Sequence, residues 1–121
     1  MDKQQPARIL IVEDEPIIAL TLEELLVEAG FKVVCVTGKL RTALALIEGP
    51  GCDAAIVDAN LGGESTSPAA LALTARGVPF IVLSGYSSEQ LQGEFPAAVF
   101  MRKPCRPDKL LHALKTIVRR Q

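Results

Sequence analysis

The stretch Ala54-Ala55-Ile56-Val57-Asp58 decides the fold, because four apolar residues in succession end there on a carboxylate. A short apolar run without alternation is typical of a strand buried on both faces of a parallel sheet. Asp58 then lies at the carboxyl end of that strand, where open α/β sheets bind their ligands. An aspartate after a strand is also a common turn residue. Its role therefore depends on which other side chains reach the same point.

The segments on either side repeat one plan, in which an apolar run is followed by apolar residues at helical spacing. Strands are predicted over 8–12, 31–36, 54–58, 79–84 and 97–101. Helices are predicted to begin near residues 16, 40, 67, 87 and 107, the third with Ser67-Pro68 as its cap and first turn. The helix over 87–92 has few apolar residues, and we expect it to be short. The glycine-rich loop over 59–63 is expected to be irregular.

Length and composition fit one compact domain. The chain has 121 residues, of which 49% are hydrophobic, and a net charge of −1 that provides no basic surface for nucleic acid. Its three cysteines lack metal-binding spacing, and no apolar run is long enough to cross a membrane, so a cytoplasmic protein is expected. We predict a flexible tail over 1–7 and one domain over 8–121, with no output domain.

Five strands alternating with five helices predict an α/β domain, in which a doubly wound five-stranded parallel sheet is flanked by helices. The strand order 2-1-3-4-5 is adopted from the common topology for such patterns rather than from periodicity. The carboxyl ends of parallel strands meet at one edge of the sheet. That edge is predicted to hold the polar residues that follow the strands, which are Glu13, Asp14, Asp58, Ser84 and Lys103.

Three carboxylates in one neighbourhood repel one another, so this edge requires cations. Lys103 is one candidate, and a divalent metal that prefers oxygen ligands is the other. Magnesium in proteins commonly binds one or two carboxylates together with water and phosphate oxygens. The sequence therefore predicts a site for Mg²⁺, or for Mn²⁺ in its place.

The pattern resembles the response-regulator receiver domain of bacterial two-component signalling. That family has an acidic pair after the first strand, an aspartate after the third, a hydroxyl residue after the fourth and Lys-Pro after the fifth. The matching positions of this chain are Glu13-Asp14, Asp58, Ser84 and Lys103-Pro104. The resemblance spans 8–118 and implies the flavodoxin-like receiver fold. The stretch Pro79-Phe80-x-x-x-Ser84-Gly85-Tyr86 is similar to a subset of receivers that are often single-domain proteins.

Carried over to this chain, the resemblance implies that Asp58 accepts a phosphoryl group from a phosphohistidine. Asp14, Asp58 and the backbone carbonyl of Asn60 are then the direct metal ligands, while Glu13 acts mainly through water because it is longer than the usual aspartate. Lys103 neutralises charge on the transferring group, in keeping with catalysis by positioning and electrostatics.

Further roles follow from the same resemblance. Ser84 is expected to hydrogen-bond the phosphoryl group, and Phe100 is expected to be the aromatic switch residue that turns inward with it. Asn60 and Tyr86 occupy positions that tune the lifetime of the acyl phosphate. The peptide bond between Lys103 and Pro104 is expected to be cis.

The implied protein is a signalling phosphoacceptor that catalyses only its own phosphorylation and dephosphorylation. Its partners are a histidine kinase or histidine phosphotransfer protein and a downstream protein target. A homodimer through helix four, strand five and helix five is a further form that the resemblance allows. Two alternatives remain at this point: a degenerate receiver that serves only for docking or dimerisation, and a phosphatase of the haloacid dehalogenase type. The phosphatase is disfavoured because Asn60 stands where those enzymes place an aspartate.

Overall fold

The computed structural model of the chain describes residues 5–85, 95 and 98–119. Within these residues, five strands form one sheet, four helices pack on it and two short strands form a separate hairpin. The sheet strands are β1 (Arg8–Val12), β2 (Lys32–Thr37), β3 (Ala54–Asp58), β6 (Phe80–Ser84) and β7 (Val99–Arg102). The helices are α1 (Pro16–Glu28), α2 (Leu40–Glu48), α3 (Ser67–Ala75) and α5 (Pro107–Arg119).

The strands run in the order β2-β1-β3-β6-β7, and every neighbouring pair is parallel. This order confirms the predicted arrangement 2-1-3-4-5, since the labels β4 and β5 belong to the hairpin. The chain winds outward in both directions from β1 and β3, which lie side by side. A ligand crevice forms outside the carboxyl ends of the strands at such a switch point.

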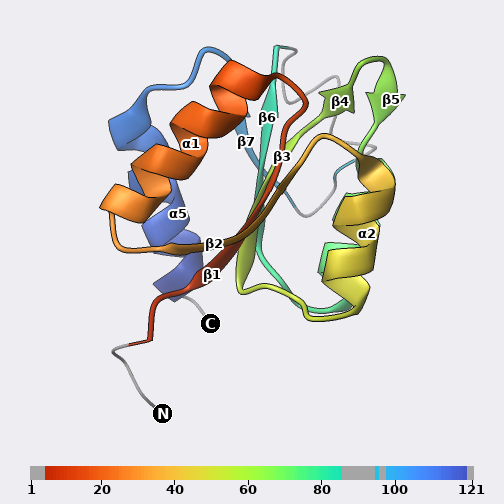
Figure 1. Cartoon of the computed structure of the whole chain (residues 1–121), viewed down its shortest axis with the longest axis horizontal. Helices are drawn as coiled ribbons and strands as arrows, with labels where there is room; N and C mark the ends of the chain where they lie inside the picture. Colours follow the sequence, from red (N-terminus) through yellow and green to blue (C-terminus); the bar gives the residue numbers. More distant parts are fainter. Residues whose placement is uncertain (1–4, 86–94, 96–97, 120–121) are drawn as a thin grey trace.

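Helices cover both faces of the sheet, and α1 and α5 lie on the opposite side from α2 (Figure 1). The alternation of side chains along the strands divides the core in two. Leu10 and Val12 pack with residues of α2 and α3 in one cluster, whereas Ile9 and Ile11 pack with residues of α1 and α5 in the other. Because helices cover both faces, β1 and β3 are apolar without alternation.

The central strand β3 is buried along its whole length, from Ala54 to Asp58. Burial of a large aliphatic side chain contributes about 1.5–3 kcal/mol to the stability of the fold, so the strand holds the carboxylate at its end in a well-defined position. The chain is attached to the sheet one residue before β1, because the Ala7 carbonyl accepts a hydrogen bond from the Lys32 N–H at 2.9 Å.

The loop after β3 is more regular than expected. Two short antiparallel strands, β4 (Asn60–Leu61) and β5 (Glu64–Ser65), form a hairpin there. Gly62 and Gly63 connect them with φ angles of 59° and 99°. A two-residue hairpin turn of type I′ needs positive φ at both positions, which glycine adopts without strain. The prediction of an irregular loop was therefore wrong, because two adjacent glycines can also make a tight turn.

The predicted element ends were close to those observed. The N-cap of α3 is Thr66 rather than Ser67, and the last strand begins at Val99 and extends to Arg102. The predicted helix over 87–92 lies outside the described residues, as does Tyr86. None of the helices in the described part of the chain is long and apolar enough to cross a membrane.

Candidate functional site

A cleft of about 350 Å³ opens at the carboxyl edge of the sheet. It gathers side chains or backbone from the ends of β1, β3, β6 and β7, which are far apart in the sequence. Five of the predicted site residues line it: Asp14, Asp58, Asn60, Ser84 and Lys103. The parallel topology brings these residues together, as the sequence analysis expected.

Asp58 lies at the end of β3 and is only 7% exposed. Its Oδ2 accepts a hydrogen bond from the Lys103 ammonium at 3.0 Å, and its Oδ1 accepts one from the Asn60 N–H at 3.3 Å. Both are bonds to a charged acceptor, which are stronger than bonds between neutral groups. The carboxylate is thus held in one orientation within the cleft.

The two acids after β1 have opposite environments. The Glu13 N–H donates to the Thr37 carbonyl of β2 at 2.8 Å, so Glu13 continues the strand and turns its side chain inward. Its carboxylate is buried and accepts hydrogen bonds from Lys103 at 3.2 Å and from the Glu15 N–H at 3.1 Å. Asp14 is exposed and lines the cleft itself.

Burial raises the pKa of the Glu13 carboxyl, and the nearby charge of Asp58 acts in the same direction. The Glu15 N–H and the Lys103 ammonium oppose this shift without cancelling it. Burial lowers the pKa of Lys103, but the hydrogen bond and charge of Asp58, with those of Glu13, outweigh it and raise the pKa overall. Lys103 is therefore firmly protonated between the two carboxylates.

The carboxylates of Glu13, Asp14 and Asp58 offer oxygen atoms that all lie within 4.8 Å of one another. Lys103 provides one positive charge against these three acids. Oxygen ligands with excess negative charge suit Mg²⁺ or Mn²⁺. The donor set therefore fits the predicted metal.

Lys103 reaches the cleft from the end of β7. Its N–H donates to the Ser84 carbonyl at 2.8 Å, which extends the pairing of β7 with β6 by one residue. The peptide bond between Lys103 and Pro104 is cis, the conformation that the resemblance implied. Ser84 is itself buried and lines the same cleft.

Phe100 is half-buried on β7 and has an aromatic partner that the sequence analysis missed. The rings of Phe100 and Phe95 are 6.3 Å apart and nearly perpendicular, at 88°. Such edge-to-face pairs add about 0.5–1.5 kcal/mol beyond their burial. Phe95 is fully buried, so the candidate switch residue packs against a core side chain. An aromatic residue shortly before the last strand was the available signal.

Gly38 is a second residue that the sequence analysis did not connect with the site. A Cβ at this position would lie 2.8 Å from the Asp14 Cα and 2.9 Å from its Cβ. Only glycine lets the chain after β2 approach Asp14 this closely. The available signal was a glycine two residues after the end of a predicted strand, at the same edge of the sheet.

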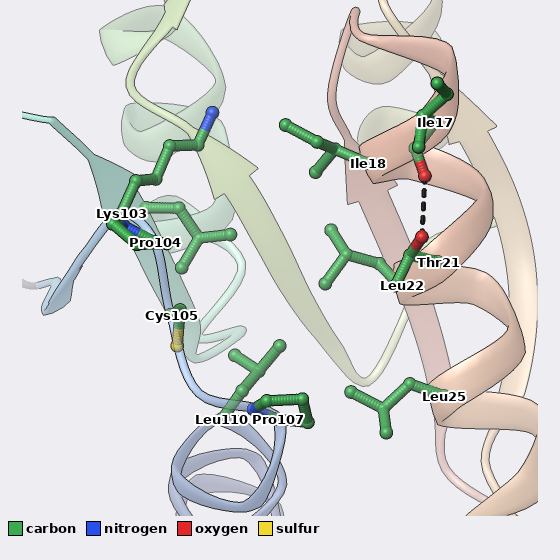
Figure 2. A pocket seen from close by; sticks show the side chains of 11 residues that line it. Ile17, Ile18, Thr21, Leu22, Leu25, Lys103, Pro104, Cys105, Pro107 and Leu110 are labelled. Carbon is green, nitrogen blue, oxygen red and sulfur yellow. Dashed lines mark hydrogen bonds between the residues drawn. The ribbon is translucent and has the colours of Figure 1, made fainter.

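A separate apolar groove of about 400 Å³ runs beside the cleft, between the start of α1 and the residues that connect β7 to α5. Figure 2 shows Ile18, Leu22 and Leu25 of α1 directed toward the side of the groove that carries Pro104 and Leu110. Ile17 lies at the start of the helix, with its side chain turned away from these two residues. Ile17 is 80% exposed. Lys103 lines both the groove and the acidic cleft, which makes them neighbours.

Comparison with known proteins identifies the class of this chain. A family profile described as the response regulator receiver domain matches residues 9–115. The chain therefore belongs to the response regulator receiver domain family, as its motifs predicted. Receiver domains interact with histidine kinases and downstream targets, and they generally bind Mg²⁺ through an acidic pocket.

Three relatives illustrate the likeness. The transcriptional regulatory protein PdtaR of Mycobacterium tuberculosis is 29% identical over 123 residues, which cover 98% of this chain and 60% of PdtaR. The sensory transduction protein RegX3 of Mycolicibacterium smegmatis is 34% identical over 116 residues, covering 93% of this chain and 50% of RegX3. The chain thus spans at most 60% of the length of these curated relatives. The solution structure of SdrG from Sphingomonas melonis Fr1 is 39% identical with a TM-score of 0.79, covering 93% of this chain and 97% of SdrG.

Proposed function

We propose that this receiver domain accepts a phosphoryl group on Asp58 and so changes the surface that it offers to a partner. The observation that supports this most strongly is the Asp58 carboxylate itself. It is fixed at the end of a buried strand, 3.0 Å from the Lys103 ammonium and within a cleft large enough for a phosphoryl group. A structural aspartate needs neither the cleft nor the two further acids.

In the proposed reaction, a carboxylate oxygen of Asp58 attacks the phosphorus of a phosphohistidine. A P–O bond forms, and the P–N bond breaks with its electron pair passing to the nitrogen. The imidazole leaves as a neutral group because its other ring nitrogen already carries a proton. The product is an acyl phosphate. Lys103 offsets the charge that develops on the phosphoryl oxygens, and the fixed carboxylate removes the entropic cost of alignment. The chain supplies these groups for its own modification only.

Asp14, Asp58 and the Asn60 carbonyl are the proposed direct ligands of Mg²⁺ or Mn²⁺, with Glu13 acting through water. When bound, the metal neutralises negative charge on the transferring phosphoryl group. Glu13 is suited to the indirect role because its carboxylate is buried and already accepts from Lys103 and the Glu15 N–H. Asp14 is exposed to the cleft and suited to direct ligation.

The signal is proposed to pass from Ser84 to Phe100. Ser84 and Arg102 are register partners on neighbouring strands, and Phe100 lies two residues before Arg102. A hydrogen bond from Ser84 to a phosphoryl oxygen would bias the packing of Phe100 on Phe95. The proposed output surface therefore includes β7, where Val99 is exposed, and α5. Dimerisation through this surface stays a prediction, since the segment over 87–92, where a helix was predicted, lies outside the described residues.

The donor is proposed to be a histidine kinase or a histidine phosphotransfer protein. Its imidazole must come within bonding distance of Asp58, so the surface around that histidine covers the rim of the cleft. The apolar groove beside Lys103 adjoins this rim and offers exposed apolar area of the kind that protein partners bury.

Intact-mass measurement tests the proposed function. The protein is incubated with acetyl phosphate and Mg²⁺, and a gain of one phosphoryl group is expected. The gain should vanish in Asp58→Asn and when the metal is chelated. If the wild-type protein gains no mass, or hydrolyses unrelated phosphomonoesters instead, the proposal is wrong.

The variant Ile17→Asp tests the donor surface. An acidic residue is compatible with the first turn of a helix, so folding should be unchanged. The rate of phosphoryl transfer from the protein donor should fall roughly tenfold, a loss of the size found for interface residues that contribute to binding. The rate of uptake from acetyl phosphate should stay the same. Leu71→Asp on α3, where Leu71 is 65% exposed, is the matched control and should change neither rate. Equal rates for both variants with the protein donor would contradict this assignment.

A further inference from the structure

Thr66 is a fully buried polar residue for which the family motif has no role. It lies between the hairpin and α3, eight residues after Asp58. Its hydroxyl donates a hydrogen bond of 2.7 Å to the backbone carbonyl of Asp58. The same residue also donates its N–H to the Ala59 carbonyl at 3.1 Å.

The hydroxyl of Thr66 is not used to cap the helix that follows. Thr66 is the N-cap of α3, where a threonine side chain normally accepts a hydrogen bond from an N–H of the first turn. No such bond is present at this cap. The side chain reaches back to the acceptor strand instead, so its bond serves the site rather than the helix.

The Asp58 carbonyl needs this donor because it lies beyond the end of β1. Successive residues of a strand direct their backbone groups to opposite neighbours. The Ala59 N–H donates to the Leu83 carbonyl of β6 at 2.9 Å, so the Asp58 carbonyl faces the other way, toward β1. The pairing of β1 with β3 ends at Val12 and Val57. Thr66 thus takes the place of a strand partner.

We propose that the Thr66 hydroxyl is a positioning group that fixes the backbone from Asp58 to Asn60 for metal binding and phosphoryl transfer. This inference rests on the proposed function. The two bonds, from Thr66 to Asp58 and from Ala59 to Leu83, hold the peptide between Asp58 and Ala59 from both sides. Without the hydroxyl, that peptide can rotate, which moves the Asp58 carboxylate and the Asn60 carbonyl together.

The test compares Thr66→Val, which keeps the volume but loses the donor, with Thr66→Ser, which keeps the hydroxyl. Two quantities are measured. The first is the rate of mass gain from acetyl phosphate at saturating Mg²⁺, and the second is the Mg²⁺ dissociation constant from an NMR titration without acetyl phosphate. Thr66→Val should take up the phosphoryl group roughly ten- to a hundredfold more slowly, because small misplacements of reacting groups have effects of that size. It should also bind Mg²⁺ several-fold more weakly. Thr66→Ser should restore both.

A mildly destabilised variant separates positioning from general loss of stability. Ile47→Val removes one methylene from a buried residue near the end of α2. Its melting temperature should fall while both measured quantities stay at their wild-type values. If Thr66→Val does not fold, Thr66→Ala provides a second variant without the donor and is judged in the same way.

Wild-type values for both quantities in Thr66→Val would overturn the positioning role, as would failure of Thr66→Ser to restore them. An equal slowing in Ile47→Val would also overturn it. If the wild-type protein binds Mg²⁺ but gains no phosphoryl group, the proposed function fails, while the titration alone still decides for or against Thr66. If the wild-type protein neither binds Mg²⁺ nor gains a phosphoryl group, both proposals are wrong.

Discussion

The two edges of the sheet differ in the partners that their acidic side chains have. At the amino edge, Asp53 precedes β3, and its Oδ2 accepts a hydrogen bond of 2.7 Å from the Arg8 N–H while its own N–H donates to the Arg8 carbonyl. The Arg8 guanidinium is directed to the Gly51 carbonyl at 2.8 Å. At the carboxyl edge, oxygens of the Glu13, Asp14 and Asp58 carboxylates lie within 4.8 Å of one another, and Lys103 forms ion pairs with two of these acids, Glu13 and Asp58.

This difference shows that the position of an aspartate relative to its strand decides its role. Asp53 and Asp58 lie at opposite ends of β3. Asp53 joins β1 to β3 through its hydrogen bonds to Arg8, while Asp58 is available for chemistry. The amino edge satisfies its acid locally with backbone. The carboxyl edge concentrates negative charge beyond what Lys103 offsets, which is unfavourable for stability unless cations bind there.

The same substitution at both ends of β3 tests this comparison and has the largest expected effect. Asp58→Asn should abolish phosphorylation, with a change in the free energy of unfolding within about 1 kcal/mol because lost pairing with Lys103 and relieved repulsion oppose each other. Asp53→Asn should keep the wild-type rate of phosphorylation but lower the free energy of unfolding by about 1 kcal/mol, since a bond to a charged acceptor becomes a neutral one. Urea unfolding and intact mass measure the two effects. The reverse pattern would invalidate the comparison.

Replacement of the shared lysine should have the next largest effect. Lys103→Gln should slow phosphoryl uptake roughly 100-fold, in the range found when one preorganised stabilising donor is removed. Its affinity for Mg²⁺ should increase, because a competing positive charge has left the acids. Lys109→Gln on the exposed side of α5 is the control and should change neither quantity. A weaker affinity for Mg²⁺ in Lys103→Gln would contradict the charge balance described for this edge.

A smaller effect, on Mg²⁺ affinity, is expected when a side chain is added at Gly38, which packs against Asp14. Gly38→Ala places a Cβ under 3 Å from the Asp14 backbone, so Asp14 must move. Mg²⁺ affinity should fall about tenfold, as is usual when support for a metal ligand is lost. Gly77→Ala, strained by its φ of 69° after α3, should lose stability but keep its Mg²⁺ affinity. Unchanged affinity in Gly38→Ala would show that Asp14 is not a direct ligand.

Much of the fold could be predicted from short apolar runs. The bounds of β1 and β3 were predicted to the residue, because strands covered on both faces are apolar throughout and their acids mark where burial ends. The meeting of Asp58 with Lys103 followed from parallel topology, which puts all carboxyl ends at one edge. The family resemblance supplied the roles that geometry alone does not assign.

The missed features depend on contacts that no local pattern encodes. Gly62 and Gly63 suggested a break, yet their positive φ angles close a hairpin. That hairpin carries Thr66 back to the Asp58 carbonyl, so its role emerges only after the turn has formed. For Phe95 and Phe100, the sequence offered an aromatic residue near the last strand, but the contact between the two rings depends on how the core packs.

The central claim is that Asp58 carries the phosphoryl group. Borohydride reduces an aspartyl phosphate to homoserine, which tandem mass spectrometry then locates in the sequence. After incubation with acetyl phosphate and Mg²⁺, homoserine is predicted at position 58 and should be missing when the metal is chelated. Homoserine at Asp14, Asp53 or another acid, with none at position 58, would contradict the account.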